Sequence, residues 1–219
     1  MKTSRRKKDL AITGQMARWY DKNTSSYRLA EMREYAALAA SRTPKGGKVL
    51  EIAPGPGYLA IELAKQGFTV TGIELSQDFV EIEKRNAKEA GISVDFRQGN
   101  ASKLPLPSET FDFAICSAAF KNFKDPLDAL NEMHRVLTPG AWALILDMNH
   151  DATKEDIEEE VQKTGMKGFD RVFVKLSFKT FLKSGAYTKE GFESLISQTS
   201  FKSREILKSG IGFQVWLGK

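Results

Sequence analysis

The residues best placed to do chemistry lie in the stretch VLEIAPGPGYLAIELA, where a strand-like run passes through a turn into a helical run. Gly55 and Gly57 would let the backbone of this turn approach a ligand beside the amino end of the helix. Pro54 and Pro56 lack the amide hydrogens that a turn uses to bind a diphosphate. Glu51 would repel a diphosphate and could attract an ammonium group. The turn therefore predicts a cationic, nucleoside-like ligand without phosphates.

The same turn leaves one alternative ligand open. The segment from Gly55 to Ala60 satisfies the pattern G-x-G-x-x-G/A, and the acidic residue Glu74 follows about 20 residues later. That spacing is also typical of a nicotinamide dinucleotide site, and hence of an oxidoreductase. A titration with NADH distinguishes the two ligands.

The elements that must position this turn alternate along the chain as strand-like and helical runs, the rhythm of βαβ units and a parallel sheet. The strand-like runs are apolar on successive residues, which suits strands covered on both faces. Five strands are predicted, at residues 48–53, 68–74, 93–98, 111–117 and 141–148. Residues 204–219 are typical of a hairpin with a Ser209-Gly210 turn. The predicted fold is α/β: a Rossmann-like, doubly wound sheet of seven strands, mostly parallel with a C-terminal antiparallel hairpin, and helices on both faces.

Helix ends are marked by residues of the right type. Ser76 is the predicted cap of a helix with Phe79, Ile82 and Ala90 on its inner face. Asp125 followed by proline opens another helix, with Leu137 as its last inward residue. Two further helices are expected, one opened by a capping box at Thr153 and Asp156 and one near residues 189–198.

Length and composition favour one domain. The chain has 219 residues, a mass of 24.4 kDa and 41% hydrophobic residues, enough for one substantial core. The domain, residues 1–219, begins with a basic flexible arm at 1–12 and N-terminal lid helices at 13–45. A cofactor-binding core at 46–150 follows, then a substrate lid at 151–187 and a terminal helix with the hairpin at 188–219.

Cysteine content and hydropathy indicate the cellular compartment of the protein. The single cysteine, Cys116, allows no internal disulfide or cysteine-based metal cluster, and its apolar surroundings predict a core position. The longest apolar run, at 141–148, is too short to span a bilayer, and the first residues lack the apolar segment of a signal peptide. We expect a cytoplasmic protein with no membrane contact and no bound metal.

The net charge of +5 is concentrated at the start of the chain. Five basic residues against Asp9 give residues 1–9 a net charge of +4, which leaves +1 for the remainder. A solvated terminus explains this arm. Nucleic acid is therefore not an expected partner, although the arm leaves it as an alternative that a deletion before Leu10 would test at varied salt.

Several segments together resemble a known family. VLEIAPGPG is similar to the motif E/D-x-G-x-G-x-G, with Ala53 in place of the first glycine. Four more segments are similar to parts of the same family. ARWYDKN precedes the first motif, and TVTGIEL, QGNASKLPLP and CSAAFKNFKDP follow it. The chain resembles the class I S-adenosylmethionine-dependent methyltransferases, in the small single-domain form typified by ubiquinone/menaquinone C-methyltransferases. The resemblance covers residues 49–148 firmly and the flanks more loosely.

This resemblance implies S-adenosyl-L-methionine as cofactor and S-adenosyl-L-homocysteine (SAH) as its product. Glu51 matches the acid that helps to hold the methionine amino group, and Glu74 matches the acid that bonds the ribose hydroxyls. The other cofactor positions that it implies are Tyr20 over the methionine side, the backbone of Ala53, Gly55 and Gly57, Leu75, Asn100 and Ala101 beside the adenine, and Ser117 and Ala118 on the floor. Purely structural roles stay open for three of them: a helix cap for Glu74, a turn for Asn100 and lid packing for Tyr20.

The acceptor is less visible than the cofactor. Phe120, Lys121 and Asn122 would approach it after the fourth strand, and Tyr187 would do so from the aromatic connection 164–187. The motif N/D-P-P-Y/F of exocyclic-amine methyltransferases is absent there, because SAAF stands in its place. His150, just past the fifth strand, is the candidate general base, with a loop hydrogen bond as its alternative role. We expect a small, partly hydrophobic acceptor, methylated on O, N, C or S mainly by positioning. An RNA- or protein-modifying enzyme and a non-catalytic cofactor-binding partner remain as alternatives.

Overall fold

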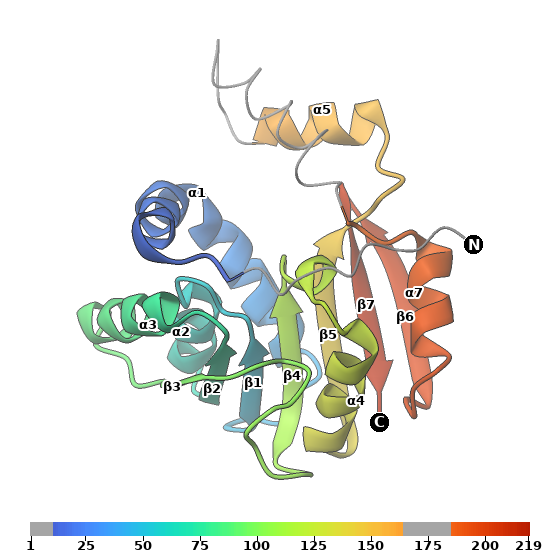
Figure 1. The fold of residues 1–219 in the computed structure, drawn as a ribbon, viewed down its shortest axis with the longest axis horizontal. Helices are drawn as coiled ribbons and strands as arrows, with labels where there is room; N and C mark the ends of the chain where they lie inside the picture. Colours follow the sequence, from blue (N-terminus) through green and yellow to red (C-terminus); the bar gives the residue numbers. More distant parts are fainter. Residues whose placement is uncertain (1–10, 164–184) are drawn as a thin grey trace.

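The computed structural model describes residues 11–163 and 185–219 (Figure 1). Its helices are α1 (Gly14–Ala40), α2 (Tyr58–Lys65), α3 (Gln77–Glu89), α4 (Pro126–Val136), α5 (Lys154–Lys163) and α7 (Lys189–Ile196), with a 3₁₀ turn η1 at Phe120–Asn122. Its strands are β1 (Lys48–Ile52), β2 (Thr69–Glu74), β3 (Asp95–Gln98), β4 (Phe111–Ser117), β5 (Leu137–Met148), β6 (Ser203–Ser209) and β7 (Gly212–Gly218).

The seven strands form one sheet in the order β3-β2-β1-β4-β5-β7-β6. The first five are parallel, and β7 is antiparallel to both β5 and β6. The chain starts the sheet at β1 and works outward to β3, then returns to the other side of β1 with β4. The sheet order therefore reverses between β1 and β4, which is where a doubly wound sheet opens a crevice for a ligand. The predicted fold class is confirmed.

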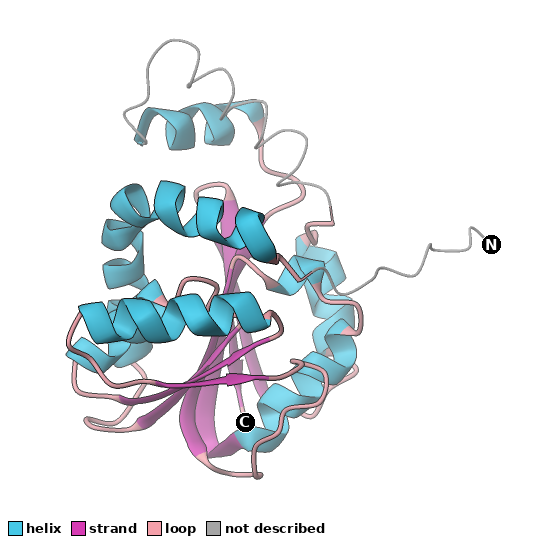
Figure 2. Cartoon of the chain, turned by 60° about the vertical axis from the view of Figure 1, so that its left-hand side comes forward, coloured by secondary structure: helices cyan, strands magenta, loops and turns pink. Residues whose placement is uncertain are grey.

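Helices cover both faces of the sheet (Figure 2). On one face, α1, α2 and α3 pack on strand residues such as Val49, Phe113 and Leu144. On the other, α4 and α7 pack on strand residues such as Leu50 and Ile145. Because successive strand residues point to opposite faces, apolar runs such as FDFAIC supply both layers at once. Cys116 lies fully buried in the second layer, as predicted, and this burial raises the pKa of its thiol.

The helix caps follow the sequence signals. The Ser76 hydroxyl accepts a hydrogen bond from the Phe79 amide, and Thr153 and Asp156 form the reciprocal bonds of a capping box. One inward position was wrong, because Ala90 is exposed at the end of α3. Leu137 is fully buried, as predicted, but it is the first residue of β5 and not the end of α4.

Strand β5 begins four residues before the predicted start because Leu137 pairs with Phe111. The pairing then shifts register between Phe111 and Phe113, while Gly140 adopts a φ of 82° that a side chain would disfavour. The irregular Pro-Gly segment therefore lies inside the strand. The hairpin turn is at Gly210-Ile211, one residue beyond the predicted position.

The structure describes one of the two predicted lid segments in full and little of the other. Residues 14–40 form the single helix α1, where several lid helices were expected. Most of the predicted substrate lid, at 164–184, lies outside the described residues, as do residues 1–10 of the basic arm. Among the described helices, none has the length and apolar character needed to cross a membrane.

Candidate functional site

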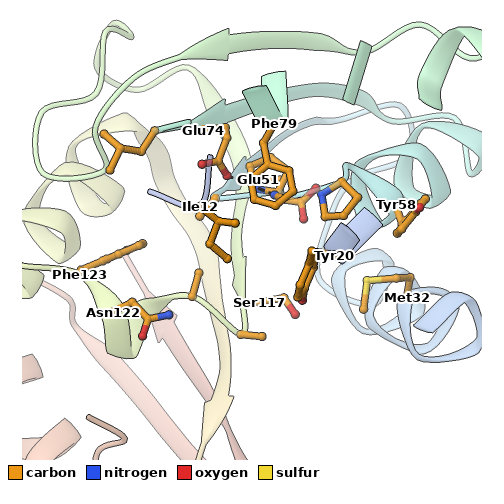
Figure 3. A pocket seen from close by; sticks show the side chains of 17 residues that line it. Ile12, Tyr20, Met32, Glu51, Tyr58, Glu74, Phe79, Ser117, Asn122 and Phe123 are labelled. Carbon is orange, nitrogen blue, oxygen red and sulfur yellow. Dashed lines mark hydrogen bonds between the residues drawn. The ribbon is translucent and has the colours of Figure 1, made fainter. Parts of the chain in front are cut away.

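A cleft lies at the point where the sheet order reverses, at the carboxyl ends of β1, β2 and β4 (Figure 3). Glu51, Glu74 and Ser117 come from these three strand ends. Asn122 and Phe123 lie on the side of the cleft opposite Tyr58 and Met32. The cleft is thus built by strands that the parallel arrangement brings to one edge.

The lining of the cleft is acidic and apolar. Among the described residues that line it, none is lysine, arginine or histidine, and the two charged groups are carboxylates. The full lining is Ile12, Tyr20, Met32, Glu51, Ala53, Pro54, Gly55, Pro56, Tyr58, Glu74, Leu75, Phe79, Ser117, Ala118, Ala119, Asn122 and Phe123. Such a lining suits a cation with an apolar body and would repel a diphosphate. The structure therefore disfavours a dinucleotide here.

Glu74 holds the glycine turn in place. Its Oε2 accepts a hydrogen bond from the Gly55 amide at 3.2 Å, and its Oε1 accepts one from the Ser76 amide at 2.9 Å. Burial raises the pKa of this carboxyl, and the backbone hydrogen bonds oppose that rise. Each carboxylate oxygen can accept more than one hydrogen bond, so Glu74 retains capacity for two hydroxyl donors of a ligand.

The backbone around the cleft is bent at positions that the sequence marks. Gly57 has a φ of 81°, and a Cβ atom there would lie 3.0 Å from Phe96 Cζ and 3.2 Å from Glu83 Cγ. Gly57 is therefore required for packing behind the turn. Ala53 and Ala118, at the ends of β1 and β4, adopt φ angles of 56° and 57° that are rare for alanine. Both strained positions line the cleft.

Two side chains near the strand ends have the chemistry to contact the cationic ligand that the sequence predicts. Glu51 is 2% exposed in β1, paired in register with Gly72 on one side and Ile115 on the other. The Ser117 hydroxyl is buried in the cleft wall and has no hydrogen-bond partner among the described residues. A buried hydroxyl without a partner is costly, so a polar ligand atom at this point would be favourable. This chemistry fits S-adenosyl-L-methionine, whose ammonium and sulfonium groups are cations.

A third carboxyl lies directly behind the turn. Glu83 of α3 is fully buried, and neither of its oxygens has a hydrogen-bond partner among the described residues. Burial, followed by the charges of Glu74 and Glu51, raises its pKa to about 10, and Lys84 opposes this. Glu83 therefore carries a proton at neutral pH.

Some predicted cofactor residues lie outside this lining. Asn100 forms a bridge with Lys103, and its Oδ1 accepts a hydrogen bond from the Ser102 amide at 2.9 Å. This is the turn role that the sequence left open. Ala101 packs against the core. Gly57 is part of the turn but does not line the described cleft. Tyr20, Ala53, Gly55, Leu75 and Ala118 do line the cleft, together with the acids and Ser117.

The predicted acceptor residues separate into two groups. Asn122 lines the cleft, whereas the Phe120 ring is fully buried in the core. Lys121 is also buried, and its amide donates a 2.8 Å hydrogen bond to the carboxylate of Asp147. Tyr187 packs its ring against Phe120, with ring centroids 5.8 Å apart. Phe120 and Lys121 thus support the cleft wall, and of this predicted set Asn122 alone is in the described lining.

His150 lies beyond the described cleft. Its side chain is 57% exposed, and its Nδ1 lies 2.8 Å from Asp151 Oδ1. The His150 amide also donates to the Tyr187 carbonyl at 3.0 Å. The imidazole is therefore oriented by a carboxylate, but it would reach an acceptor only if that acceptor extended past the cleft to the end of β5.

The sequence missed several apolar lining residues. Ile12 and Met32 come from segments outside the motifs, so their approach to the cleft depends on tertiary packing. Phe123 lies within CSAAFKNFKDP, next to the predicted residue Asn122. Phe79 was predicted to face inward from its helical spacing, and the structure shows that this inner face borders the cleft. Tyr58 follows the glycine turn directly, and that position was the one available signal for it.

Comparison with known proteins finds similarity to methyltransferases. Residues 50–145 match the profile described as "Methyltransferase domain". A demethylmenaquinone methyltransferase of Deinococcus radiodurans is 34% identical over 117 residues, which cover 52% of this chain and 48% of the relative. Residues 50–145 are therefore similar to a methyltransferase domain. The match spans about half the length of that curated relative.

Solved structures agree on the methyltransferase fold. A candidate S-adenosyl-L-methionine-dependent methyltransferase of Methanococcus maripaludis superimposes with a TM-score of 0.79 at 19% identity, covering 96% of this chain and 97% of that one. A plantazolicin methyltransferase, solved in complex with SAH, gives a TM-score of 0.67 at 16% identity and covers 94% and 89% of the two chains. At such identities the likeness shows the fold of this chain alone.

Proposed function

We propose that this chain transfers a methyl group from S-adenosyl-L-methionine to a small, partly hydrophobic acceptor. The observation that carries the proposal is the cleft where the sheet order reverses: its described lining has two buried carboxylates and no cationic side chain. S-adenosyl-L-methionine supplies an activated methyl group on its sulfonium. The protein's task is then to hold donor and acceptor in line and to exclude water, which can contribute about 7 to 11 kcal/mol.

Each cofactor contact in the proposal follows from the position of a side chain. Glu74 would accept the ribose hydroxyls while it holds Gly55, and Glu51 would attract the ammonium group. The Tyr20 ring, which packs edge-on to Phe79 with centroids 6.1 Å apart, would cover the ligand from α1. Ser117 would direct its hydroxyl at a polar atom of the ligand. Leu75, directly after β2, would contact the adenine, whereas Asn100 and Ala101 lie outside the described lining.

The acceptor class is drawn from the lining and from the relatives. Phe123, Met32 and Ile12 add apolar surface to the walls of the cleft, and Asn122 supplies one amide that could bond an acceptor oxygen. Relatives are named demethylmenaquinone methyltransferases. A reduced quinone-like ring is therefore the first acceptor class to test, and carbon is the first candidate for the methylated atom.

A general base is required only if the acceptor atom carries a proton. His150 remains the proposed base, and its pairing with Asp151 fixes the orientation of the ring. This role depends on an acceptor long enough to reach from Asn122 to the end of β5. We propose the cytoplasm as the location of the protein. Residues 1–10 of the basic arm lie outside the described residues, so a nucleic-acid substrate gains no support from the structure.

The proposal is tested with radiolabelled S-adenosyl-L-methionine and a panel of reduced naphthoquinones and benzoquinones, beside a cell-metabolite extract analysed by mass spectrometry. We expect label in an apolar product with the wild-type chain, and a strong loss of label with Glu74→Gln. Glu81→Gln is the matched control, because Glu81 is an exposed acid on α3. Absence of any methylated product, or equal activity of the two variants, would contradict the proposal.

A further inference from the structure

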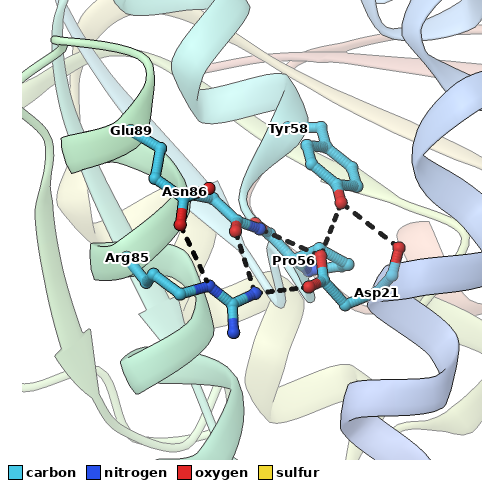
Figure 4. A network of polar contacts seen from close by, with 6 residues as sticks. All are labelled: Asp21, Pro56, Tyr58, Arg85, Asn86 and Glu89. Carbon is cyan, nitrogen blue, oxygen red and sulfur yellow. Dashed lines mark hydrogen bonds and ion pairs between the residues drawn. The ribbon is translucent and has the colours of Figure 1, made fainter.

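A buried carboxylate on α1 joins three helices beside the glycine turn (Figure 4). Asp21 is 9% exposed, although it lies on a helix whose neighbouring residues Arg18, Trp19 and Lys22 are exposed. Its side chain accepts hydrogen bonds from the Tyr58 hydroxyl of α2 and from the Arg85 guanidinium of α3. A buried acid on an otherwise exposed stretch of helix indicates a specific connection.

The network also reaches the backbone of the turn. Asn86 Nδ2 donates to Asp21 Oδ1 at 3.0 Å and to the Pro56 carbonyl at 3.0 Å. The Tyr58 hydroxyl lies 3.3 Å from the Asp21 carbonyl oxygen as well. Asp21 is thereby connected to the turn at Pro56 through Asn86, and directly to Tyr58, the first residue of α2.

The position of α1 matters because its first residues form one wall of the cleft. Tyr20, next to Asp21, lines the cleft, and so does Ile12 just before the helix. The start of this segment is fixed separately, since Ser76 Oγ donates to the Ile12 carbonyl at 2.6 Å. One end of the wall is thus held by the loop after β2, and the other end is held by Asp21.

We propose that Asp21 is a positioning residue that holds α1, and with it Tyr20, against the glycine turn so that the cleft can retain the cofactor nucleoside. This rests on the proposed function, because the ligand retained is the one inferred above. Asp21 itself is absent from the described lining of the cleft, so it acts through Tyr58, Asn86 and Arg85.

Arg85 gives the sharpest test. It is a half-exposed residue on the outer side of α3 and does not line the described cleft, so its loss would affect ligand retention through Asp21. The matched control is Arg33, which joins a different pair of helices, α1 and α2, through an ion pair with Glu62 at 3.4 Å. Among the described contacts, none links Arg33 to the Asp21 network. Arg85→Gln cuts the proposed connection, and Arg33→Gln cuts a connection between helices away from the turn.

The measurements are the dissociation constant of SAH by calorimetry and its dissociation rate by stopped-flow fluorescence. We expect Arg85→Gln to weaken SAH binding about fivefold and Asp21→Asn about tenfold or more, both through faster dissociation, as for the loss of a hydrogen bond to a charged group. The double variant should be little weaker than Asp21→Asn alone, because the two residues act in one network. Arg33→Gln should stay within about twofold of wild type, the range typical of an exposed pair.

Kinetics separate positioning from general damage. With an acceptor in hand, Arg85→Gln should raise the KM for S-adenosyl-L-methionine and leave kcat nearly unchanged, and Arg85→Lys should restore part of the loss. If SAH binds wild type, Arg85→Gln and Asp21→Asn with equal affinity, the positioning role is wrong and the proposed function stands. If wild type binds no SAH at all, the proposed function fails and this inference fails with it. If Asp21→Asn does not fold, Arg85→Gln and Asn86→Ala still decide the question.

Discussion

Glu83 offers a prediction that depends directly on the structure behind the glycine turn. Its carboxyl is fully buried without a hydrogen-bond partner among the described residues, and its pKa in the folded chain rises from the ordinary 4.5 to about 10. Between these two values the folded state binds a proton that the unfolded state releases. The free energy of unfolding therefore contains a contribution that is fully present below pH 4.5 and is lost as the pH rises toward 10.

The magnitude follows from proton linkage. One proton of difference changes the free energy of unfolding by about 1.4 kcal/mol per pH unit. From pH 5 to pH 8 this group alone would cost at most about 4 kcal/mol, a large share of the roughly 5 to 15 kcal/mol that stabilises a typical domain. Glu83→Gln keeps the shape and hydrogen-bonding character of the neutral acid, but it cannot lose a proton.

The assay is urea unfolding of wild type and Glu83→Gln at several pH values from 5 to 8, followed by circular dichroism. We expect the two proteins to have similar stability at pH 5 and the variant to become the more stable one as the pH rises. Subtracting the two curves removes the contributions of other titrating groups, and Glu81→Gln, exposed on the same helix, should run parallel to wild type. Parallel curves for wild type and Glu83→Gln would refute the reasoning, because they would show that Glu83 is ionised in the folded chain or is not buried.

Three further substitutions test other parts of the account. Ala53→Gly should stabilise the chain by about 0.5 to 1 kcal/mol in urea unfolding, because the φ of 56° at this position is unfavourable for alanine and ordinary for glycine; a loss of stability would contradict this. Arg42→Lys should lower the free energy of unfolding by about 1 to 2 kcal/mol, because the guanidinium lies between Trp142 and Trp216, 4.2 and 4.3 Å from the ring centroids, and bonds both oxygens of Glu205; an unchanged urea midpoint would show that the stacking contributes nothing. His150→Ala should lower turnover by about a hundredfold or more if His150 is the base, with SAH affinity unchanged; full turnover would exclude that role.

The sheet was predictable from the sequence because its central strands are buried on both faces. Runs such as AWALIL have no polar face to present to solvent, so they had to be interior strands. The start of β5 was not predictable in the same way, because the Pro-Gly step before Ala141 is typical of a break. In the structure that step is an irregular part of the strand, and pairing between Leu137 and Phe111 supports it.

That Glu51, Gly55 and Glu74 line one cleft was predictable, because they are close to one another in the sequence and follow strands of one parallel sheet. Glu51, the glycine turn and Glu74 fall within 24 residues of chain, and parallel strands bring their ends together. The network of Asp21 joins residues 37 and 64 positions apart, so no local pattern indicates it. Glu83 lies four residues after Phe79, on the inner face that the helical spacing predicts, and only its charge argued against burial.

The most direct test of the central claim is a calorimetric titration of the wild-type chain with S-adenosyl-L-methionine, SAH and NADH, repeated with Glu51→Gln. The account predicts saturable binding of the two sulfur nucleosides, no binding of NADH, and weaker binding of both nucleosides when the charge at residue 51 is removed. Binding of NADH alone, or of S-adenosyl-L-methionine with equal affinity to Glu51→Gln, would contradict the claim that buried carboxylates shape this cleft for a cation.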